Sequence, residues 1–141
     1  MRRQLFLSFA AIALAVICNA QPNGAWIPSK IRGILYPNLA RHSKLEGDVK
    51  AKCVIKEDGS VADVEILSSP HSLLSNEVKN NLLQWKFLHR GSRADKNEAI
   101  VTYTFQLTGE CEDERLCKET EFWYEYPYHV IARADHYPMR Y

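Results

Sequence analysis

Histidines, cysteines and one Ser-Ser pair are the side chains of this sequence that could do chemistry. A histidine acts as a general base or a metal ligand only when a suitable partner stands at a suitable spacing. The five histidines, at positions 42, 71, 89, 129 and 136, lie in unrelated local settings without such a partner. Ser68-Ser69 does not match the sequence context of a nucleophile elbow. We therefore predict no catalytic residue, no metal site and no cofactor.

The cysteines favour structural roles. Cys53 lies in an alternating segment, so we expect a small buried side chain and not a nucleophile, which needs a base and access to solvent. Cys111 and Cys117 flank a polar segment and are the natural disulfide pair if the chain is exported. Because the number of cysteines beyond the first twenty residues is odd, other pairings stay open.

The N-terminal residues 1–20 read as a secretory signal: a basic start, the apolar run Leu5–Ile17, and small residues up to Ala20. The run is shorter than the roughly 20 apolar residues that cross a bilayer. Cleavage after Ala20 is the favoured interpretation, and lipidation of Cys18 or a retained anchor are the alternatives. We expect a periplasmic or secreted protein, with no membrane span after cleavage.

The charge balance excludes one class of partner. The chain has 18 basic and 17 acidic residues, and loss of Arg2 and Arg3 with the signal leaves it close to neutral. A near-neutral domain offers no electrostatic reason to bind nucleic acid. What remains after the signal is one domain by size.

The first half of that domain reads as a helix and a hairpin after the connector 21–35. Proline favours a helix over residues 36–44, with Leu39 facing inward and Arg41 outward. Period-two alternation predicts strands over residues 48–56 and 61–68. Asp58-Gly59 between them is a strong signal for a tight turn.

A second helix and a third strand follow. Leu74, Val78, Leu82 and Trp85 recur at helical spacing, so we expect a helix over residues 72–86 that covers the sheet, with Leu83 beside the core and Asn81 on the wet face. The polar residues 91–98 predict a loop. Alternation resumes over residues 99–107 and predicts the third strand.

The order of these features resembles the C-terminal domain of TonB-type energy transducers. The resemblance runs from Tyr36-Pro37 through Gly47 and Asp58-Gly59 to Trp85-Lys86-Phe87. It implies an α+β fold in which a small antiparallel sheet, three strands plus a C-terminal strand or hairpin, packs against a long helix. Residues 36–109 would form this domain and 110–141 a cysteine-containing aromatic extension. The resemblance also implies that the chain is not an enzyme.

The resemblance further implies how a partner is bound. In that family the domain adds a short extended peptide to the sheet edge at the third strand. An edge strand offers unpaired backbone groups for affinity, and alternate side chains for specificity. The partner would be a protein or peptide, for example a segment of an outer-membrane receptor. The corresponding residues here are Ile100, Val101, Thr102, Tyr103, Thr104 and Phe105.

Two features depart from the transducers. The connector of about 15 residues reaches at most roughly 50 Å, too short to join an inner-membrane motor to the outer membrane, so we expect a freestanding relative. The C-terminal extension, with a predicted hairpin of residues 122–125 and 130–133, can also pair with the third strand and cover its edge. The alternative function is then a secreted structural or inhibitory protein whose aromatic patch binds another target. The patch residues are Phe122, Trp123, Tyr124, Tyr126 and Tyr128.

Overall fold

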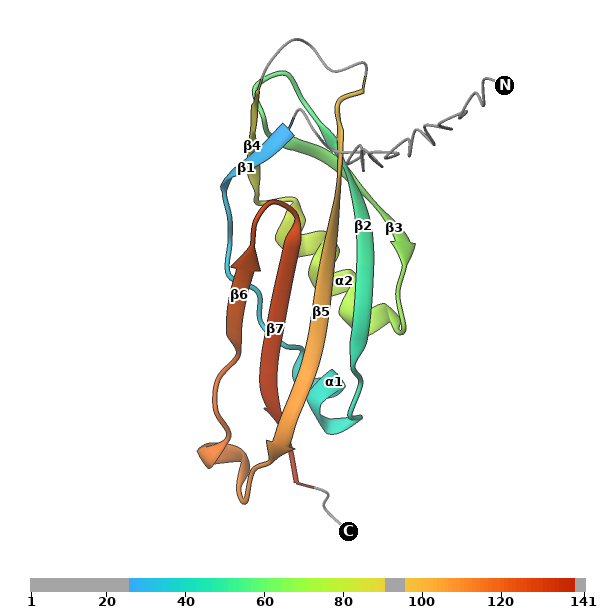
Figure 1. Ribbon diagram of the computed structural model, residues 1–141. Coiled ribbons are helices and arrows are strands. Elements are labelled where there is room, and N and C mark those ends of the chain that lie inside the picture. The colour runs from blue at the N-terminus through green and yellow to red at the C-terminus, as the bar shows by residue number, and fades with distance from the viewer. Residues whose placement is uncertain (1–25, 91–95, 139–141) are drawn as a thin grey trace, which may run out of the picture.

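Five strands form the main sheet, in the order β3-β2-β5-β7-β6 (Figure 1). The computed structural model describes residues 26–90 and 96–138, so the predicted signal, residues 1–20, lies outside the described part. The strands of this sheet are β2 (Gly47–Ile55), β3 (Val61–Ser68), β5 (Glu98–Glu110), β6 (Glu121–Glu125) and β7 (His129–His136).

The first three strands of this sheet form as the alternation predicts. β2 pairs antiparallel with both β3 and β5. The inward residues of β2 are almost fully buried, among them Val49, Ala51 and Cys53, because side chains of a strand point alternately to its two faces. At the tight turn Gly59 has a φ of 86°, and a Cβ there would come within 2.0 Å of the Phe87 carbonyl oxygen. Only glycine fits this turn.

The C-terminal extension completes the sheet in a way that differs from the expectation of an antiparallel sheet. β6 and β7 form the predicted hairpin, with Phe122 opposite Ala132 and Glu125 opposite His129. β7, however, runs parallel to β5, with Thr102 opposite His129 and Leu107 opposite Ala134. The sheet is therefore mixed. After β5, the chain forms β6 two strand positions away. It then turns back and forms β7 between β5 and β6.

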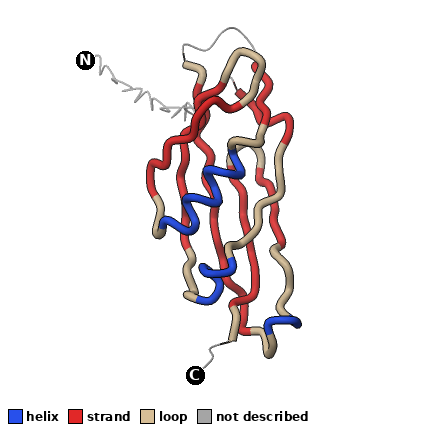
Figure 2. Tube along the Cα trace, turned by 180° about the vertical axis from the view of Figure 1, so that it is seen from behind, coloured by secondary structure: helices blue, strands red, loops and turns tan. Residues whose placement is uncertain are grey.

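The covering helix is shorter than predicted. α2 spans Ser72–Leu82 and lies across one face of the sheet, as the view from behind shows (Figure 2). The expected continuation to Lys86 is wrong: Lys86 begins β4 (Lys86–His89), which pairs with β1 (Trp26–Lys30) in a separate two-stranded sheet. The predicted connector thus contributes a strand. Trp85, between α2 and β4, is buried.

The first helix is also shorter, and it presents a different face. α1 spans Asn38–His42. Leu39, expected inside, is 63% exposed, whereas Arg41, expected outside, is 5% exposed. The Arg41 guanidinium donates to the backbone oxygens of Asp135 (2.7 Å) and Lys118 (2.9 Å). It therefore connects α1 to the C-terminal extension.

A disulfide closes the loop between β5 and β6. Cys111 and Cys117 are bonded, as predicted, across a short 3₁₀ helix, η1 (Glu114–Leu116). Among the described residues no helix is long and apolar enough to span a membrane.

Candidate functional site

The predicted binding residues form one continuous stretch of β5, in the middle of the sheet. Their side chains alternate: Val101, Tyr103 and Phe105 are buried in the core, and the other three point to the opposite face. That opposite face, the outer face, is turned toward the viewer in Figure 1, with α2 behind the sheet. The structure thus brings all six predicted residues, Ile100 to Phe105, together.

The backbone of this stretch has a strand on both sides. β2 pairs with it on one side, from Lys52 opposite Ile100 to Gly47 opposite Phe105. β7 pairs with it on the other side from Thr102 onward. In this conformation the hydrogen-bonding edge of β5 is therefore occupied from Thr102 to Leu107 by the protein's own C-terminal strand.

Buried side chains fix β7 against β5. Val130, Ala132 and Ala134 of β7 are at most 3% exposed and belong to the main core. Small side chains are needed there because the large rings of Tyr103 and Phe105 fill the neighbouring positions of β5, 6.5 Å apart. β7 is therefore a core strand of this fold as well as an occupant of the edge.

A chain of polar contacts ties the β6–β7 hairpin to the outer face. The Thr104 hydroxyl lies 2.7 Å from Asp48 Oδ1 and 2.8 Å from His129 Nε2, and His129 Nδ1 lies 3.0 Å from Glu125 Oε2. These contacts cross β2, β5, β7 and β6 in turn. The start of β7 is thus fixed to its neighbours on both sides.

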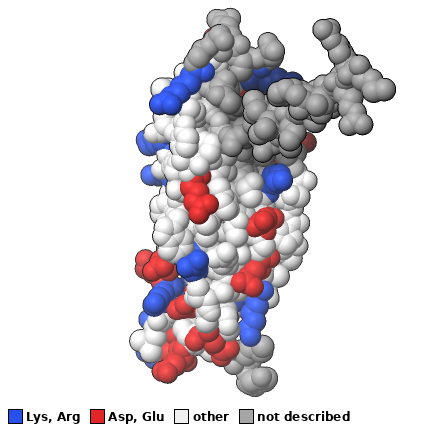
Figure 3. Space-filling view, viewed as in Figure 1, with Lys and Arg blue, Asp and Glu red and all other residues white. Residues whose placement is uncertain are grey.

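A shallow hollow of about 550 Å³ lies on the same face, and the residues that make these polar contacts form part of its lining. Its lining combines outer-face side chains of β2 and β5 with the β6–β7 turn, including Thr102, Pro127 and Tyr128. Figure 3 shows this face: the charged side chains gather toward the end of the molecule where the C-terminus lies, and the middle of the face carries fewer.

A buried amide on the inner face was missed by the sequence interpretation. Asn81, expected on the wet face of α2, is 4% exposed. Its Oδ1 accepts from the Trp85 indole N–H (3.0 Å) and from the Tyr103 hydroxyl (2.7 Å). Its Nδ2 donates to the backbone oxygens of Arg32 (3.2 Å) and Gly33 (3.0 Å). The Asn81 amide thus joins α2, β5 and the segment that precedes α1.

The spacing on α2 could have revealed this residue. Leu74, Val78, Asn81 and Trp85 stand at i, i+4, i+7 and i+11, which is the apolar stripe of a helix. Leu83 lies off that stripe and is 42% exposed, contrary to expectation. A polar residue on such a stripe indicates a satisfied amide in the core, because an unsatisfied one is costly to bury.

The buried thiol has no features of a reactive site. Burial raises the pKa of Cys53 to about 12, so the reactive thiolate is scarce near neutral pH. Among the described residues no group of three or more His, Cys, Asp or Glu side chains is placed to hold a metal ion.

In protein produced from Gln21 onward, which lacks Cys18, we expect a maleimide to leave Cys53 unmodified in the native state at about pH 8 and to add once after unfolding in urea. The disulfide occupies the other two thiols of the described chain. Intact mass measured before and after unfolding checks this. A label on the native protein, or a cross-linked peptide that contains Cys53, would contradict the buried position.

Comparison with known proteins defines the family. A family model described as the Gram-negative bacterial TonB protein C-terminal matches residues 32–107, more than half of the chain. The chain therefore belongs to the TonB C-terminal domain family. This is a family of non-enzymatic cell-envelope domains, in agreement with the prediction that the chain is not an enzyme.

The similar proteins match this chain over part of its length. Protein TonB of Pseudomonas aeruginosa is 28% identical over an alignment of 94 residues that covers 61% of this chain and 28% of that protein. Protein TonB of Escherichia coli is 40% identical over 53 residues, which is 37% of this chain and 22% of that protein. The chain thus spans about a quarter of the length of these relatives.

A solved structure supports the fold. The solution NMR structure of the Pseudomonas aeruginosa TonB C-terminal domain aligns with a TM-score of 0.50 at 26% identity, covering 62% of this chain and 91% of that one. The family match ends at Leu107, within β5. The disulfide loop, β6 and β7 therefore lie beyond the part that the family model matches.

Proposed function

We propose that this domain binds an extended segment of a cell-envelope protein by β-strand addition, in association with TonB-type transport across the outer membrane. The receiving strand is β5, at residues Ile100 to Phe105. The observation that carries the proposal is the extent of the family match: residues 32–107 contain β3, β2 and most of β5 but not β7. Within that matched part β5 is the edge of the sheet, where an unpaired backbone can accept a further strand.

In this protein the incoming segment has to exchange with β7. It must lie parallel to β5 to replace the existing ladder. It must also carry small apolar residues at alternate positions to replace Val130, Ala132 and Ala134, because larger side chains would overpack the core beside Tyr103. The proposal therefore specifies the pattern of the bound segment and its direction.

A covalent lock between β5 and β7 tests the exchange. Gln106 and Arg133 are directly opposite on the outer face, with Arg133 Nη2 3.1 Å from Gln106 Oε1. We expect the oxidised Gln106→Cys/Arg133→Cys variant to lose binding of a peptide with the sequence of residues 128–136, which is the segment known to fit β5. Fluorescence anisotropy of the labelled peptide measures this, and a scrambled peptide is the control. Binding should return on reduction, with wild type in the same reductant as reference.

The same variant tests natural partners. Capture of envelope proteins by the wild type and by the locked variant, followed by mass spectrometry, identifies those that need β5. Equal binding of the 128–136 peptide to locked and unlocked protein would contradict strand addition at β5.

A second candidate function is favoured by the core position of β7. If β7 stays paired with β5 when a partner binds, the chain is a structural or inhibitory member of the family. Its own β7 then occupies the edge of β5, and its aromatic patch binds the partner. The capture experiment distinguishes the two candidate functions. If the second is correct, the wild type and the locked variant capture the same partners in equal amounts.

A further inference from the structure

The C-terminal extension creates a new sheet edge. β6 is the last strand of the main sheet, and among the described strands β7 alone pairs with it. Within residues 26–90 and 96–138, no sheet ladder or backbone hydrogen bond joins β6 to a segment other than β7. The outer edge of β6 therefore carries backbone donors and acceptors without a strand partner, which is the feature that invites a further strand.

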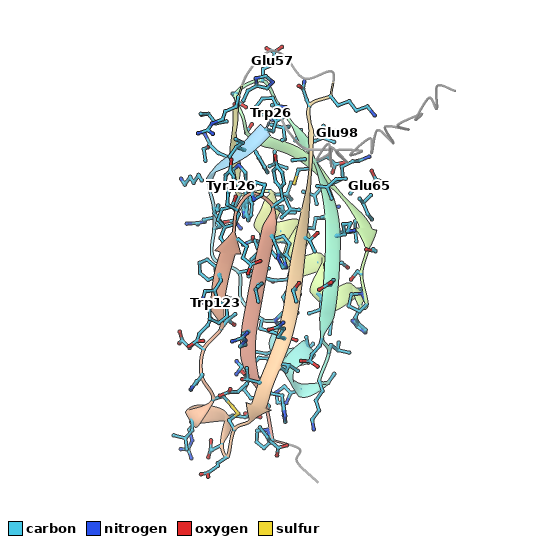
Figure 4. The ribbon with its side chains drawn as sticks, viewed as in Figure 1. Trp26, Glu57, Glu65, Glu98, Trp123 and Tyr126 are labelled. Carbon is cyan, nitrogen blue, oxygen red and sulfur yellow. A yellow bond between two sulfur atoms is a disulfide. The ribbon has the colours of Figure 1, made fainter. Side chains whose placement is uncertain are left out.

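The side chains of β6 are unusual for an exposed edge. Its sequence is Glu-Phe-Trp-Tyr-Glu, and Phe122 and Trp123 are 44% and 42% exposed. Figure 4 shows Trp123 beside β6 and Tyr126 at the turn to β7. Large aromatic side chains that are half exposed are typical of the centre of protein interfaces.

Packing holds these rings in place. Trp123 lies under the Arg133 guanidinium, whose Cζ is 4.7 Å from the ring. Tyr124 points inward and meets Trp85 edge to face at 6.2 Å. Phe122 lies against Gly33, where a Cβ would come within 2.8 Å of the ring. Since the strand is already ordered, a partner that adds to it loses little conformational entropy on the β6 side.

Charge indicates what kind of strand fits. Glu121 and Glu125 flank the aromatic residues, and β6 has no basic residue. A second copy of β6, paired antiparallel about Trp123, would place glutamate opposite glutamate, which is destabilising. A segment with Lys or Arg at two positions four residues apart, about 13 Å along a strand, would instead place a cation opposite each carboxylate.

The opposite edge of the sheet lacks this combination. β3 has no aromatic residue, and its Glu65 is already paired with Lys52 at 2.8 Å. On β6, Glu125 lies 3.0 Å from His129 Nδ1, whereas Glu121 makes no ion pair with another described residue. Of the two sheet edges, β6 alone combines half-exposed aromatic rings with flanking carboxylates.

We propose that β6 is a docking edge for an extended segment of a partner protein that carries two basic residues four positions apart around an apolar residue. This goes beyond strand exchange at β5, because it uses a different edge and leaves β7 in place. The apolar residue lies against Trp123, and the two basic side chains lie beside Glu121 and Glu125.

The test uses two peptides, each labelled at the N-terminus with the same fluorophore, that differ only in charge: Thr-Lys-Thr-Val-Thr-Lys-Thr-amide, and the same sequence with both lysines replaced by glutamate. Fluorescence anisotropy with the wild type should give about tenfold tighter binding of the lysine peptide, the size expected for two exposed ion pairs. The Glu121→Lys/Glu125→Lys variant should reverse this preference. Its thermal unfolding, compared with that of the wild type, verifies the fold.

The covalent lock separates this site from β5. The oxidised Gln106→Cys/Arg133→Cys variant should bind the lysine peptide as the singly substituted Arg133→Cys protein does, whether or not exchange at β5 occurs. Loss of binding in the locked protein alone would assign the peptide to β5 and overturn the proposal. So would equal binding of the two peptides. A concentration-dependent dimer in sedimentation that the lysine peptide does not dissociate would assign the edge to a second copy of the chain and likewise overturn it.

Discussion

Replacing Trp85 with Ala is expected to lower the free energy of unfolding by about 3–5 kcal/mol. The indole is 1% exposed. It lies 6.1 Å from the rings of Phe87 and Tyr103 and 6.2 Å from that of Tyr124. Truncation therefore opens a cavity between the helix and the sheet and removes the hydrogen bond to Asn81. Urea denaturation followed by circular dichroism measures the change.

Leu83 is the matched control for Trp85. It stands two residues earlier and is 42% exposed, so Leu83→Ala should cost less than about 1 kcal/mol. A loss of under 1 kcal/mol for Trp85→Ala would contradict the packing of the indole between α2 and the sheet.

Replacing Asn81 with Leu is expected to lower the free energy of unfolding by about 3–6 kcal/mol, because each buried polar group left without a partner costs about 1–3 kcal/mol. The substitution orphans the Trp85 indole N–H and the Tyr103 hydroxyl, and it removes the donor to the carbonyls of Arg32 and Gly33. Denaturation in urea again measures the loss.

Two further variants test whether the hydrogen bonds of Asn81 cause this loss of stability. Asn80→Leu, on the exposed side of α2, should have little effect on stability. Adding Tyr103→Phe to Asn81→Leu should cost less than the sum of the single changes, because it removes one of the orphaned groups. If Asn81→Leu proves as mild as Asn80→Leu, the amide does not hold these elements together.

Strand faces were predictable where one face is charged and the other apolar. In β2, lysines alternate with Val49, Ala51 and Cys53, and a register shift by one residue would bury the charges. The same reasoning failed for α1, where Leu39 is exposed and Arg41 is buried. A helix of five residues has too few turns to define a face, and the partners of Arg41 lie more than 75 residues away in sequence.

The direction of β7 could not be read from local patterns. The aromatic segment and its turn predict a hairpin, and β6 and β7 form one. Whether β6 or β7 lies next to β5 depends on the loop between β5 and β6, whose path includes the Cys111–Cys117 disulfide. This loop spans the width of two strand spacings, about 10 Å. Alternation is the same in either arrangement, so only the tertiary structure distinguishes an antiparallel from a parallel neighbour.

The proposed binding residues were inferred from the resemblance to the family, and their surroundings could not be inferred in this way. Ile100 to Phe105 do form part of one strand, and they lie within the range that the family model matches. The sequence raised the possibility that the extension covers this strand, and β7 does cover it. The sheet edge at β6 exists because β7 lies between β5 and β6. β6 lies outside residues 32–107, so the family match could not predict this edge.

The position of β7 in the chain has a consequence for how the protein is made. β7 follows every other described strand in sequence, yet it lies between β5 and β6. A ribosome that delivers the chain from its N-terminus therefore releases β2, β3 and β5 before β7, the strand that completes the sheet beside β5. During that interval β5 has an open edge, and the parallel, long-range pairing that closes it is slow to form. Nascent chains are thus the form of this protein in which β5 is most accessible to a chaperone or a partner.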